Sequence, residues 1–287
     1  MIAVTGANGY VGGRVLAQLR DQGIETVALV RTPALGDERE RRYALAQPLD
    51  ASALEGVDTV VHAAYDLAAW GADVRTVNCA GSLPLLDALA ERGGRAILIS
   101  SLAAFAGARS HYGQAKLALE RAVLSRGGAV VRPGLVFGMG AGGLFGALVQ
   151  AVSREPVTPL VGGGWQRLFI THDRSLCRLV AAIATGQAES DRPIFAAHAV
   201  PTTLRAIAAE IARAHGRRLL VVPVPTAIAY AGLRALERAG LRGPFRADSV
   251  RSISNPIPLD QVAALARLAV DFPPLRRELW LGDDGLN

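Results

Sequence analysis

The chain has 287 residues, of which 51% are hydrophobic and 20% are charged, and it carries a formal net charge of +6. This composition is typical of a folded protein with a sizeable apolar core, and it excludes a disordered chain. The densest basic run, "RERR" at residues 39–42, contains Glu40 and follows two acidic residues, so it does not indicate a nucleic-acid or membrane ligand. We therefore expect neither as a partner, and a cleft for a phosphorylated ligand is the better use of the arginines.

The two cysteines, Cys79 and Cys177, stand in apolar contexts, and with the five histidines they form no spacing typical of metal ligands. We expect buried free thiols in a reducing compartment and no metal. The chain begins with a predicted strand, "MIAVTG", where a signal peptide would stand, and its longest apolar stretch, residues 129–152, is interrupted by Arg132 and Pro133. These features predict a soluble cytoplasmic protein.

The first 135 residues alternate short apolar runs with longer amphipathic segments. In chain order they predict strands at 2–6, 26–31, 58–64, 95–101 and 129–134, and helices at 11–23, 74–92 and from about Tyr112 onward. A charged loop with a short turn is expected between the second and third strands. Strands that are apolar on both faces and alternate with helices predict an α/β fold with a Rossmann-like, doubly wound parallel sheet.

Beyond residue 135 the pattern is looser, with a glycine-rich stretch at 138–146 that we expect to be a loop. Helices are predicted at 175–186, 203–216 and 225–240, and strands at 192–198 and 218–225. We expect a dinucleotide-binding Rossmann domain over 1–157 and a smaller C-terminal α/β lobe for the substrate over 158–287. Elements at about 168–200 are expected to return to the main sheet.

The segment "TGANGYVGG" follows the first strand and opens the first helix, with glycines at T-G-x-x-G-x-x-G spacing. The first glycine permits a tight turn, the second lets the backbone approach a pyrophosphate, and the third permits close packing of helix on sheet. The helix start adds N–H groups and partial positive charge for phosphates. This context favours dinucleotide binding over a purely structural turn. The loop residues expected at the cofactor are Gly6, Asn8, Gly9, Tyr10, Val11 and Gly12.

Arg31 stands at the end of the second predicted strand, where a site for NAD would present an acidic residue to the ribose hydroxyls. Arginine can pair with a 2′-phosphate instead, and Arg14 could assist it. The alternative is a surface arginine in a chain with 30 of them. We predict NADP as the cofactor, with NAD as the alternative.

Tyr112 and Lys116 are four residues apart in "HYGQAK", so they project from one face of the predicted helix. An ammonium favours the ionised form of a nearby phenol, whose ordinary pKa is about 10. A compact ammonium can also donate to the ribose of a nicotinamide nucleotide. Lys116 is the only lysine in the chain. Its retention among so many arginines indicates a specific role rather than a solvated helix face.

These motifs resemble the extended short-chain dehydrogenase/reductases, the NAD(P)-dependent epimerase/dehydratase family, best over the first 180 residues. The resemblance is carried by "TGANGYVG", "GVDTVVHAA", "VNCAGSLPLLDA", "ILISSLAAFAG", "YGQAKLALE", "VVRPGLVFG" and "FITHDRSLCRLVAAI". It implies that Tyr112 is the acid–base residue and Lys116 its partner. It also implies a structural or capping role for Asp173. Further cofactor contacts are implied from Ala63, Ala64, Asn78, Lys116, Pro133 and Gly134.

The chain departs from the family pattern just after the strand that ends in "SS". Sugar epimerases of the family commonly place a catalytic Ser or Thr where this chain has Leu102, so Ser101 is the best donor to the substrate oxygen, with Ser100 as the alternative. Dehydratases add an Asp–Glu pair where this chain has Ala103 and Ala104. The absence of that pair disfavours dehydration. The family's adenine-holding Asp-Leu is also missing, and Asp50 is only a weak substitute.

The resemblance and the motifs together predict an NAD(P)-dependent epimerase or ketoreductase that transfers a hydride at a hydroxyl or keto carbon. A nucleotide-linked sugar is the favoured substrate, and Arg167 and Arg246 are either partners of its diphosphate or surface charges. The alternatives are a reductase of a steroid-like or natural-product ketone, and a non-catalytic NADP-binding regulator. The resemblance also implies a homodimer through the two helices at 74–92 and Tyr112, unless their apolar faces only cover the sheet.

Overall fold

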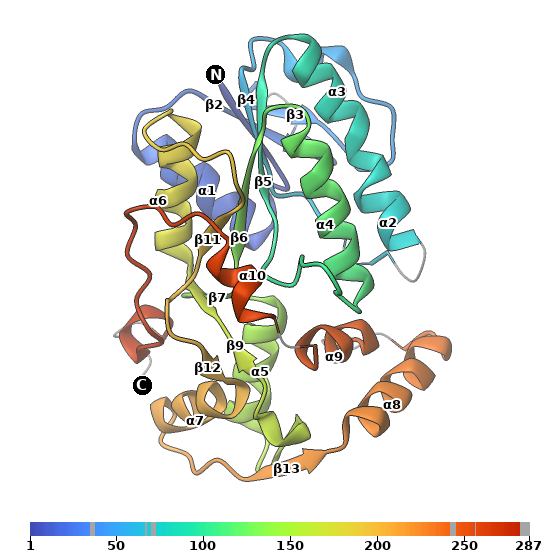
Figure 1. Cartoon of the computed structure of the whole chain (residues 1–287), viewed down its shortest axis with the longest axis vertical. Coiled ribbons are helices and arrows are strands. Elements are labelled where there is room, and N and C mark those ends of the chain that lie inside the picture. The colour runs from blue at the N-terminus through green and yellow to red at the C-terminus, as the bar shows by residue number, and fades with distance from the viewer. Residues whose placement is uncertain (35–37, 67, 70–72, 242–244, 256, 282–287) are drawn as a thin grey trace.

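The computed structural model describes residues 1–34, 38–66, 68–69, 73–241, 245–255 and 257–281. Its centre is a parallel sheet of seven strands in the order β11-β6-β5-β4-β1-β2-β3 (Figure 1). The strands are β1 (Ile2–Thr5), β2 (Thr26–Val30), β3 (Glu40–Arg42), β4 (Thr59–His62), β5 (Arg95–Ile99), β6 (Ala129–Pro133) and β11 (Ile194–Ala196). The predicted α/β class and doubly wound Rossmann-like sheet are confirmed.

Apart from the edge strand β3, the sheet is buried on both faces, and its strands are nearly continuous runs of apolar residues, mostly Val, Ile, Leu and Ala. Helices α1 (Tyr10–Asp21) and α6 (Asp173–Ala184) pack together on one face. Helices α2 (Asp73–Asn78), α3 (Leu83–Glu91) and α4 (His111–Leu124) cover the other (Figure 1). From β1, the strands β2 and β3 are added on one side of the sheet, and β4, β5 and β6 are added on the other. The strand order therefore reverses beside β1, and crevices at such switch points bind ligands in this architecture.

The second half of the chain builds a smaller body below the carboxyl ends of these strands (Figure 1). It has its own apolar core, centred on Phe137, Phe145, Ile207 and Trp280. Three strand pairs support it: β7 (Leu135–Phe137) with β10 (Ile170–His172), β8 (Thr158–Val161) with β13 (Val221–Val224), and β9 (Arg167–Leu168) with β12 (Thr202–Thr203). Its helices are α5 (Gly143–Arg154), α7 (Leu204–Ala214), α8 (Thr226–Arg238), α9 (Ala247–Ile253) and α10 (Leu259–Ala263).

Three elements differ from the prediction. The helix expected at 74–92 is broken into α2, the 3₁₀ turn η2 (Ala80–Ser82) and α3. Pro84 stands in the first turn of α3, where a proline cannot continue a preceding helix, and a Cβ at Gly81 would lie 2.6 Å from Ala46 N. The charged loop contains β3, whose charged residues suit a sheet edge. The prediction of a glycine-rich loop at 138–146 is partly wrong, since α5 begins within this stretch and buries Phe145, Leu148 and Val152 at helical spacing.

Asp50, the two cysteines and the surfaces of the helices were also subjects of prediction. Asp50 caps the 3₁₀ turn η1 (Ala51–Leu54), accepting from Ser52 N at 3.0 Å, which gives it a local structural role. Both thiols are free, with Cys177 buried and Cys79 half-buried. Within the described part of the chain, no helix is long and apolar enough to cross a membrane. No large apolar side chain described on α2, α3 or α4 is exposed, so the homodimer stays a prediction.

A buried chain of hydrogen bonds ties β1 to β4 and η2. Ser82 Oγ donates to a backbone carbonyl, so it must accept from His62 Nε2 at 2.9 Å. His62 Nδ1 then accepts from Thr5 Oγ1 at 2.9 Å, and this oxygen in turn accepts the N–H groups of Ala63 and Ala64. Every polar atom of the neutral imidazole is satisfied. Burial lowers the pKa of His62 to about 3, and the charge of Lys116 adds to the effect.

The depressed pKa of His62 predicts how stability depends on pH. Between pH 6.5 and about 3, this histidine is protonated in the unfolded chain but stays neutral in the folded protein. The stability of the fold therefore declines as the pH drops, by up to about 1.4 kcal/mol per pH unit from this group. His62→Gln should be less stable than the native protein at pH 7.5, because it breaks the hydrogen-bond chain, but its stability should decline less steeply in acid.

Urea unfolding between pH 7.5 and 4.5 measures both slopes. His215→Gln, a change at a partly exposed histidine, is the matched control and should keep the native slope. Parallel slopes for the native protein and His62→Gln would contradict this assignment.

Candidate active site

The glycine-rich loop has the shape that a dinucleotide diphosphate requires. Gly6 has a φ of +65°, and a Cβ there would lie 2.8 Å from Ala64 N. A Cβ at Gly12 would lie 2.3 Å from Gly6 O, so only glycine lets α1 pack this closely. Gly9 is exposed and begins α1 without a side-chain cap, which leaves the first N–H groups of the helix to a ligand. These residues fit a bound nicotinamide dinucleotide.

The other side chains near the loop divide into two groups. Asn8 is exposed beside Gly9, and Arg31 is exposed at the carboxyl end of β2 with no ion-pair partner among the described residues. Tyr10 is turned away, since its hydroxyl donates to Asp173 Oδ2 at 2.6 Å. Arg14 also pairs with Asp173, at 3.0 Å, and donates to a backbone carbonyl. Arg14 is therefore engaged elsewhere and does not assist Arg31 as expected.

Asp173 is the buried centre of this contact between the loop and α6. A Cβ at Gly138 would lie 2.2 Å from its Oδ2, so the chain after β7 closes directly over the carboxylate. Burial and the hydrogen bond to Asp173 raise the pKa of Tyr10 well above its ordinary value. Val11, the next residue, packs against the apolar core. The side chains of Tyr10 and Val11 thus have supporting positions, while their backbone N–H groups are among those at the start of α1 that remain for a ligand.

The strand ends β4 and β6 complete the cofactor side. Ala63 and Ala64 lie directly beside Gly6, held there by the Thr5 hydroxyl. Asn78 is buried, and its side-chain amide forms hydrogen bonds with backbone groups of Asp66 and Val74. After Pro133, Gly134 lines the pocket described below, and a Cβ on it would lie 2.1 Å from Phe169 O.

Tyr112, Lys116 and Ser101 meet at the carboxyl end of β5. The Lys116 ammonium is buried, donates to Ile99 O at 2.7 Å and lies 4.7 Å from the centre of the Tyr65 ring. Burial lowers the pKa of Lys116 to about 8, while the charge of Glu120 acts in the opposite direction. The pKa of Tyr112 is raised by burial, and a hydrogen bond with Ser101 acts to lower it.

The two serines of the "SS" pair have different environments. Ser100 is buried and donates to the Glu120 carboxylate. Glu120 also receives two hydrogen bonds from Arg132, at 2.8 and 2.5 Å, so the carboxylate and guanidinium form a buried pair behind the site. Ser101 instead lines the pocket. Glu120 was missed in the sequence, although it continues the four-residue spacing of Tyr112 and Lys116.

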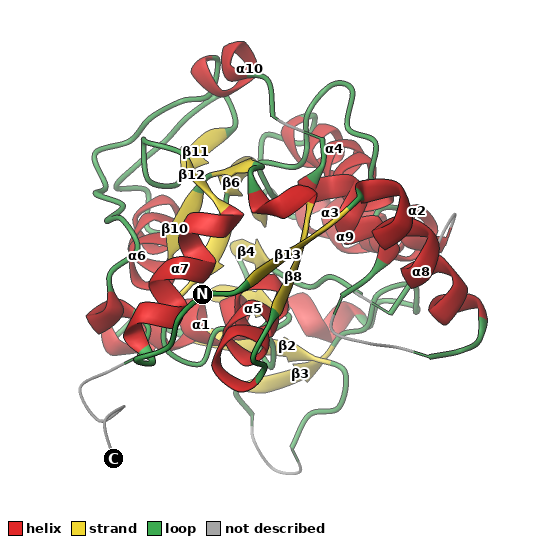
Figure 2. Cartoon of the chain, turned by 90° about the horizontal axis from the view of Figure 1, so that it is seen from below, coloured by secondary structure: helices red, strands yellow, loops and turns green. Residues whose placement is uncertain are grey.

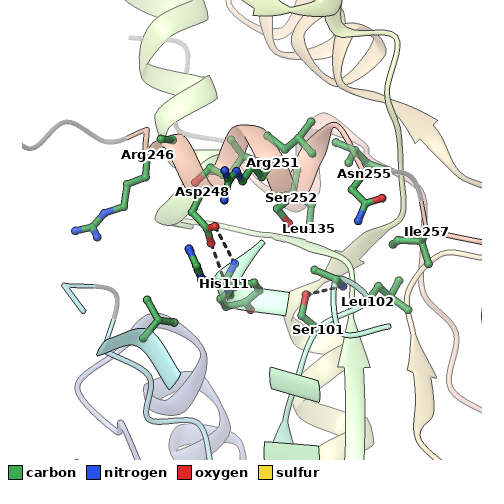
Figure 3. Close-up of a pocket in the computed structure, with 18 of the residues that line it drawn as sticks. Ser101, Leu102, His111, Leu135, Arg246, Asp248, Arg251, Ser252, Asn255 and Ile257 are labelled. Carbon is green, nitrogen blue, oxygen red and sulfur yellow. Dashed lines mark hydrogen bonds between the residues drawn. The ribbon is translucent and has the colours of Figure 1, made fainter. Parts of the chain in front are cut away.

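A pocket of about 630 Å³ opens in front of Ser101 and Tyr112, between the strand ends and helices α8 and α9 (Figure 3). One part of its wall is apolar, with Leu102, Leu135, Leu144, Leu168, Phe169 and Ile257. Four arginines line another part, namely Arg167, Arg234, Arg246 and Arg251. The sequence pointed to Arg167 and Arg246. It missed Arg234 and Arg251, which lie on helical segments without a motif.

Tyr65 is a further pocket residue that the motifs did not indicate. Its ring meets that of Tyr112 edge-on, with 5.1 Å between the centres, and its other contact is the Lys116 ammonium. Its hydroxyl is buried without a hydrogen-bond partner among the described residues. Tyr65 thus touches both residues of the Tyr–Lys pair. Its place directly after "HAA", at a strand end, is the signal that could have identified it.

Two carboxylates of the smaller body hold helix starts in place. Asp248 of α9 accepts the N–H groups of His111 and Tyr112, at 2.9 and 3.0 Å (Figure 3). Glu237 of α8 accepts the N–H of Ala247, at the start of α9, at 3.0 Å. Negative charge at the start of a helix is stabilising. No sequence pattern could have paired Asp248 with Tyr112, since 136 residues separate them.

Comparison with solved structures agrees with the fold described above. A structure of MoeE5 in complex with UDP-glucose and NAD superposes with a TM-score of 0.69 at 21% identity, covering 88% of this chain and 96% of that one. UDP-N-acetylglucosamine 4-epimerase from Bacillus cereus gives a TM-score of 0.62 at 19% identity, with the same coverages of 88% and 96%. At these identities the likeness shows the shared fold.

Sequence comparison adds a curated relative and a family. The chain is 30% identical to a ceramide reductase from Caulobacter vibrioides over 203 residues, which cover 64% of this chain and only 61% of that protein. The model of the NAD dependent epimerase/dehydratase family matches residues 2–194, about two thirds of the chain. The glycine loop, the strand ends and the Tyr–Lys pair all lie within that match. The chain belongs to the NAD-dependent epimerase/dehydratase family.

Proposed function

We propose that this protein is an NAD(P)-dependent epimerase or ketoreductase that transfers a hydride at a hydroxyl or keto carbon, with a nucleotide-linked sugar as the favoured substrate. The observation that carries the proposal is that Ser101 and Tyr112 line the pocket together, beside the strand ends that adjoin the glycine loop, with the buried Lys116 ammonium at the end of β5. A protein that only bound NADP would need no acid–base group at this point.

The proposed roles follow from the environment of each group. When bound, the nicotinamide supplies or accepts the hydride. In the reducing direction, Ser101 and Tyr112 hydrogen-bond the carbonyl oxygen, and Tyr112 gives its proton to that oxygen as the alcohol forms. Because burial raises the pKa of Tyr112, the phenol is protonated and ready as an acid at neutral pH. The Lys116 ammonium, one helical turn away, favours the phenolate that remains.

The arginines support a nucleotide-linked sugar. Arg167 and Arg246 line the pocket with Arg234 and Arg251, and guanidinium groups recognise diphosphates through paired N–H donors. MoeE5, which shares the fold, is described with UDP-glucose bound. Arg31, exposed at the end of β2, favours NADP over NAD, because a guanidinium can pair with the 2′-phosphate of NADP.

Dehydration is disfavoured because the pocket's carboxylates are already engaged. Ala103 lines the wall where dehydratases of the family carry an acid. Asp66 accepts from Ala68 N, and both oxygens of Asp248 accept backbone N–H groups. Glu237 accepts from Ala247 N and contacts Arg234. Each of the three thus has a structural contact, and none stands directly after Ser101, where the family's acid pair would be.

A second candidate is a reductase of a non-sugar carbonyl. The apolar wall from Leu102 to Ile257 would suit a ligand with a long apolar part, and one curated relative is a ceramide reductase. The chemistry at Ser101, Tyr112 and Lys116 would be the same. Only the ligand differs between the two candidates.

Replacing Tyr112 with Phe tests the proposal. The change removes the proton donor and keeps the ring against Tyr65, so turnover should fall by roughly 10²–10⁴-fold while cofactor binding persists. Panels of nucleotide sugars and ketones, each offered with NADPH and NADH, can be followed by absorbance and by product analysis. Conversion without net absorbance change would identify epimerisation. Undiminished turnover by Tyr112→Phe, or no conversion of any panel member, would refute the assignment.

Asp248 is expected to be a positioning residue that acts through the start of α4. Asp248→Ala removes the acceptor for the Tyr112 N–H, so kcat should drop about tenfold, with a smaller effect on cofactor affinity. Asp248→Asn keeps one acceptor oxygen and should restore part of kcat. Arg238→Ala, at an exposed position on α8, is the control. Equal kcat values for native, Asp248→Ala and Asp248→Asn proteins would show that this cap does not position Tyr112.

A further inference from the structure

Helix α8 turns its polar face inward. Tyr230, Arg234 and Glu237 line the pocket, and the Tyr230 ring lies 4.5 Å from the guanidinium of Arg251 in α9. Glu237 accepts the Ala247 N–H at the start of α9. These contacts fix the orientation of α8 against α9. Its opposite face therefore points away from the protein.

That outward face is almost wholly apolar. It consists of Ile228, Ala231, Gly232, Ala235, Leu236 and Ala239, all of which are exposed. No residue of α8 is buried, and Ile228 is 63% exposed. A surface helix of a globular protein normally shows the reverse arrangement, with the apolar face inward. An exposed apolar stripe of this kind indicates a surface that something else covers.

The apolar surface continues beyond α8 over the neighbouring strands. Leu220 and Val222 project from the β13 segment, and the ring of Trp165, beside Gly163 and Pro223, is 67% exposed. We call Trp165, Leu220, Val222, Ile228, Leu236 and Leu241 the distal apolar surface. Figure 2 views this end of the molecule directly, with β13 and α8 in front. Most of the exposed large apolar side chains that the structure describes lie here rather than on the sheet or its helices.

The positive charge of the chain is concentrated in the same region. Residues 204–254, which contain α7, β13, α8 and α9, have nine arginines and three acidic residues, an excess equal to the net charge of the whole chain, and three of these arginines, Arg234, Arg246 and Arg251, line the pocket. The remainder of the chain has equal numbers of basic and acidic residues. Arg218 and Arg238 are exposed beside the distal apolar surface. Exposed apolar side chains bordered by arginines match the interface of an anionic bilayer.

We propose that the distal apolar surface binds the face of an anionic lipid bilayer, with α8 lying in the interface plane. Ile228, Leu236 and Val222 would enter the boundary between headgroups and acyl chains, Trp165 would lie at the headgroup level, and Arg218 and Arg238 would contact anionic lipids. Nucleic acid would satisfy the charge but would leave the apolar face exposed. A second copy would cover the apolar face but would bring the two arginine-rich segments together. This binding is peripheral, and it revises the expectation from the overall charge pattern that no membrane is involved.

Sedimentation of the full chain with lipid vesicles tests the proposal. The protein should sediment with vesicles of phosphatidylcholine mixed with phosphatidylglycerol, and far less with phosphatidylcholine alone. Added salt should weaken the binding. Ile228→Asp/Leu236→Asp should lower vesicle affinity at least about tenfold, and Arg218→Glu/Arg238→Glu should do so without touching the apolar side chains.

The matched control is Val200→Asp/Leu259→Asp, which places the same charges at apolar positions of similar exposure outside the distal apolar surface. It should bind vesicles like the native protein. Circular dichroism checks that each variant is folded. Absence of sedimentation with the anionic vesicles, or equal losses in the control and the Ile228/Leu236 variant, would overturn the proposal. So would a dimer, detected by light scattering, that the Ile228/Leu236 variant abolishes while no protein binds vesicles.

Discussion

The burial of the single Lys116 ammonium is the constraint on which the site depends. A charge removed from water is costly unless it gains compensating contacts. Here the compensation comes from the Ile99 carbonyl, the face of Tyr65 and the field of Glu120. Glu120 is in turn paired with Arg132, so these three buried groups carry one net positive charge, and the Ile99 carbonyl and the Tyr65 ring face are the other contacts that stabilise it. A guanidinium is planar and larger, so this compact environment accounts for a lysine in a chain that otherwise uses arginine.

The smaller body also positions the site, because its helices are linked to one another and to α4 by carboxylates that cap helix starts. Glu237 of α8 caps the start of α9, and Asp248 of α9 caps the start of α4, where Tyr112 lies. The position of the proposed proton donor therefore depends on a helix far away in the chain. Helix α8 also carries Ile228 and Leu236 of the distal apolar surface.

Much of this arrangement could be predicted because it is encoded locally. The alternation of strands and helices, the glycine spacing and the Tyr112–Lys116 pair each occupy a short stretch of sequence. The different environments of Ser100 and Ser101 required the structure, because Ser100 is bound by a carboxylate, Glu120, that the distant Arg132 holds. Asp248 and Arg251 reach the pocket only through tertiary packing. The break between α2 and α3 did have a local signal in Pro84, which stands in the first turn of α3, whereas the close contact of Gly81 with Ala46 is tertiary.

The titration of Lys116 tests the role of this buried ammonium most directly. Because the chain has one lysine, untagged protein labelled with ¹³C-lysine gives a single side-chain signal that can be followed by NMR as the pH is varied. A midpoint at about pH 8 is expected, with a shift when oxidised cofactor binds beside it. A midpoint near the ordinary lysine value of about 10.4, unchanged by either cofactor, would contradict the placement of this ammonium in a hydride-transfer site.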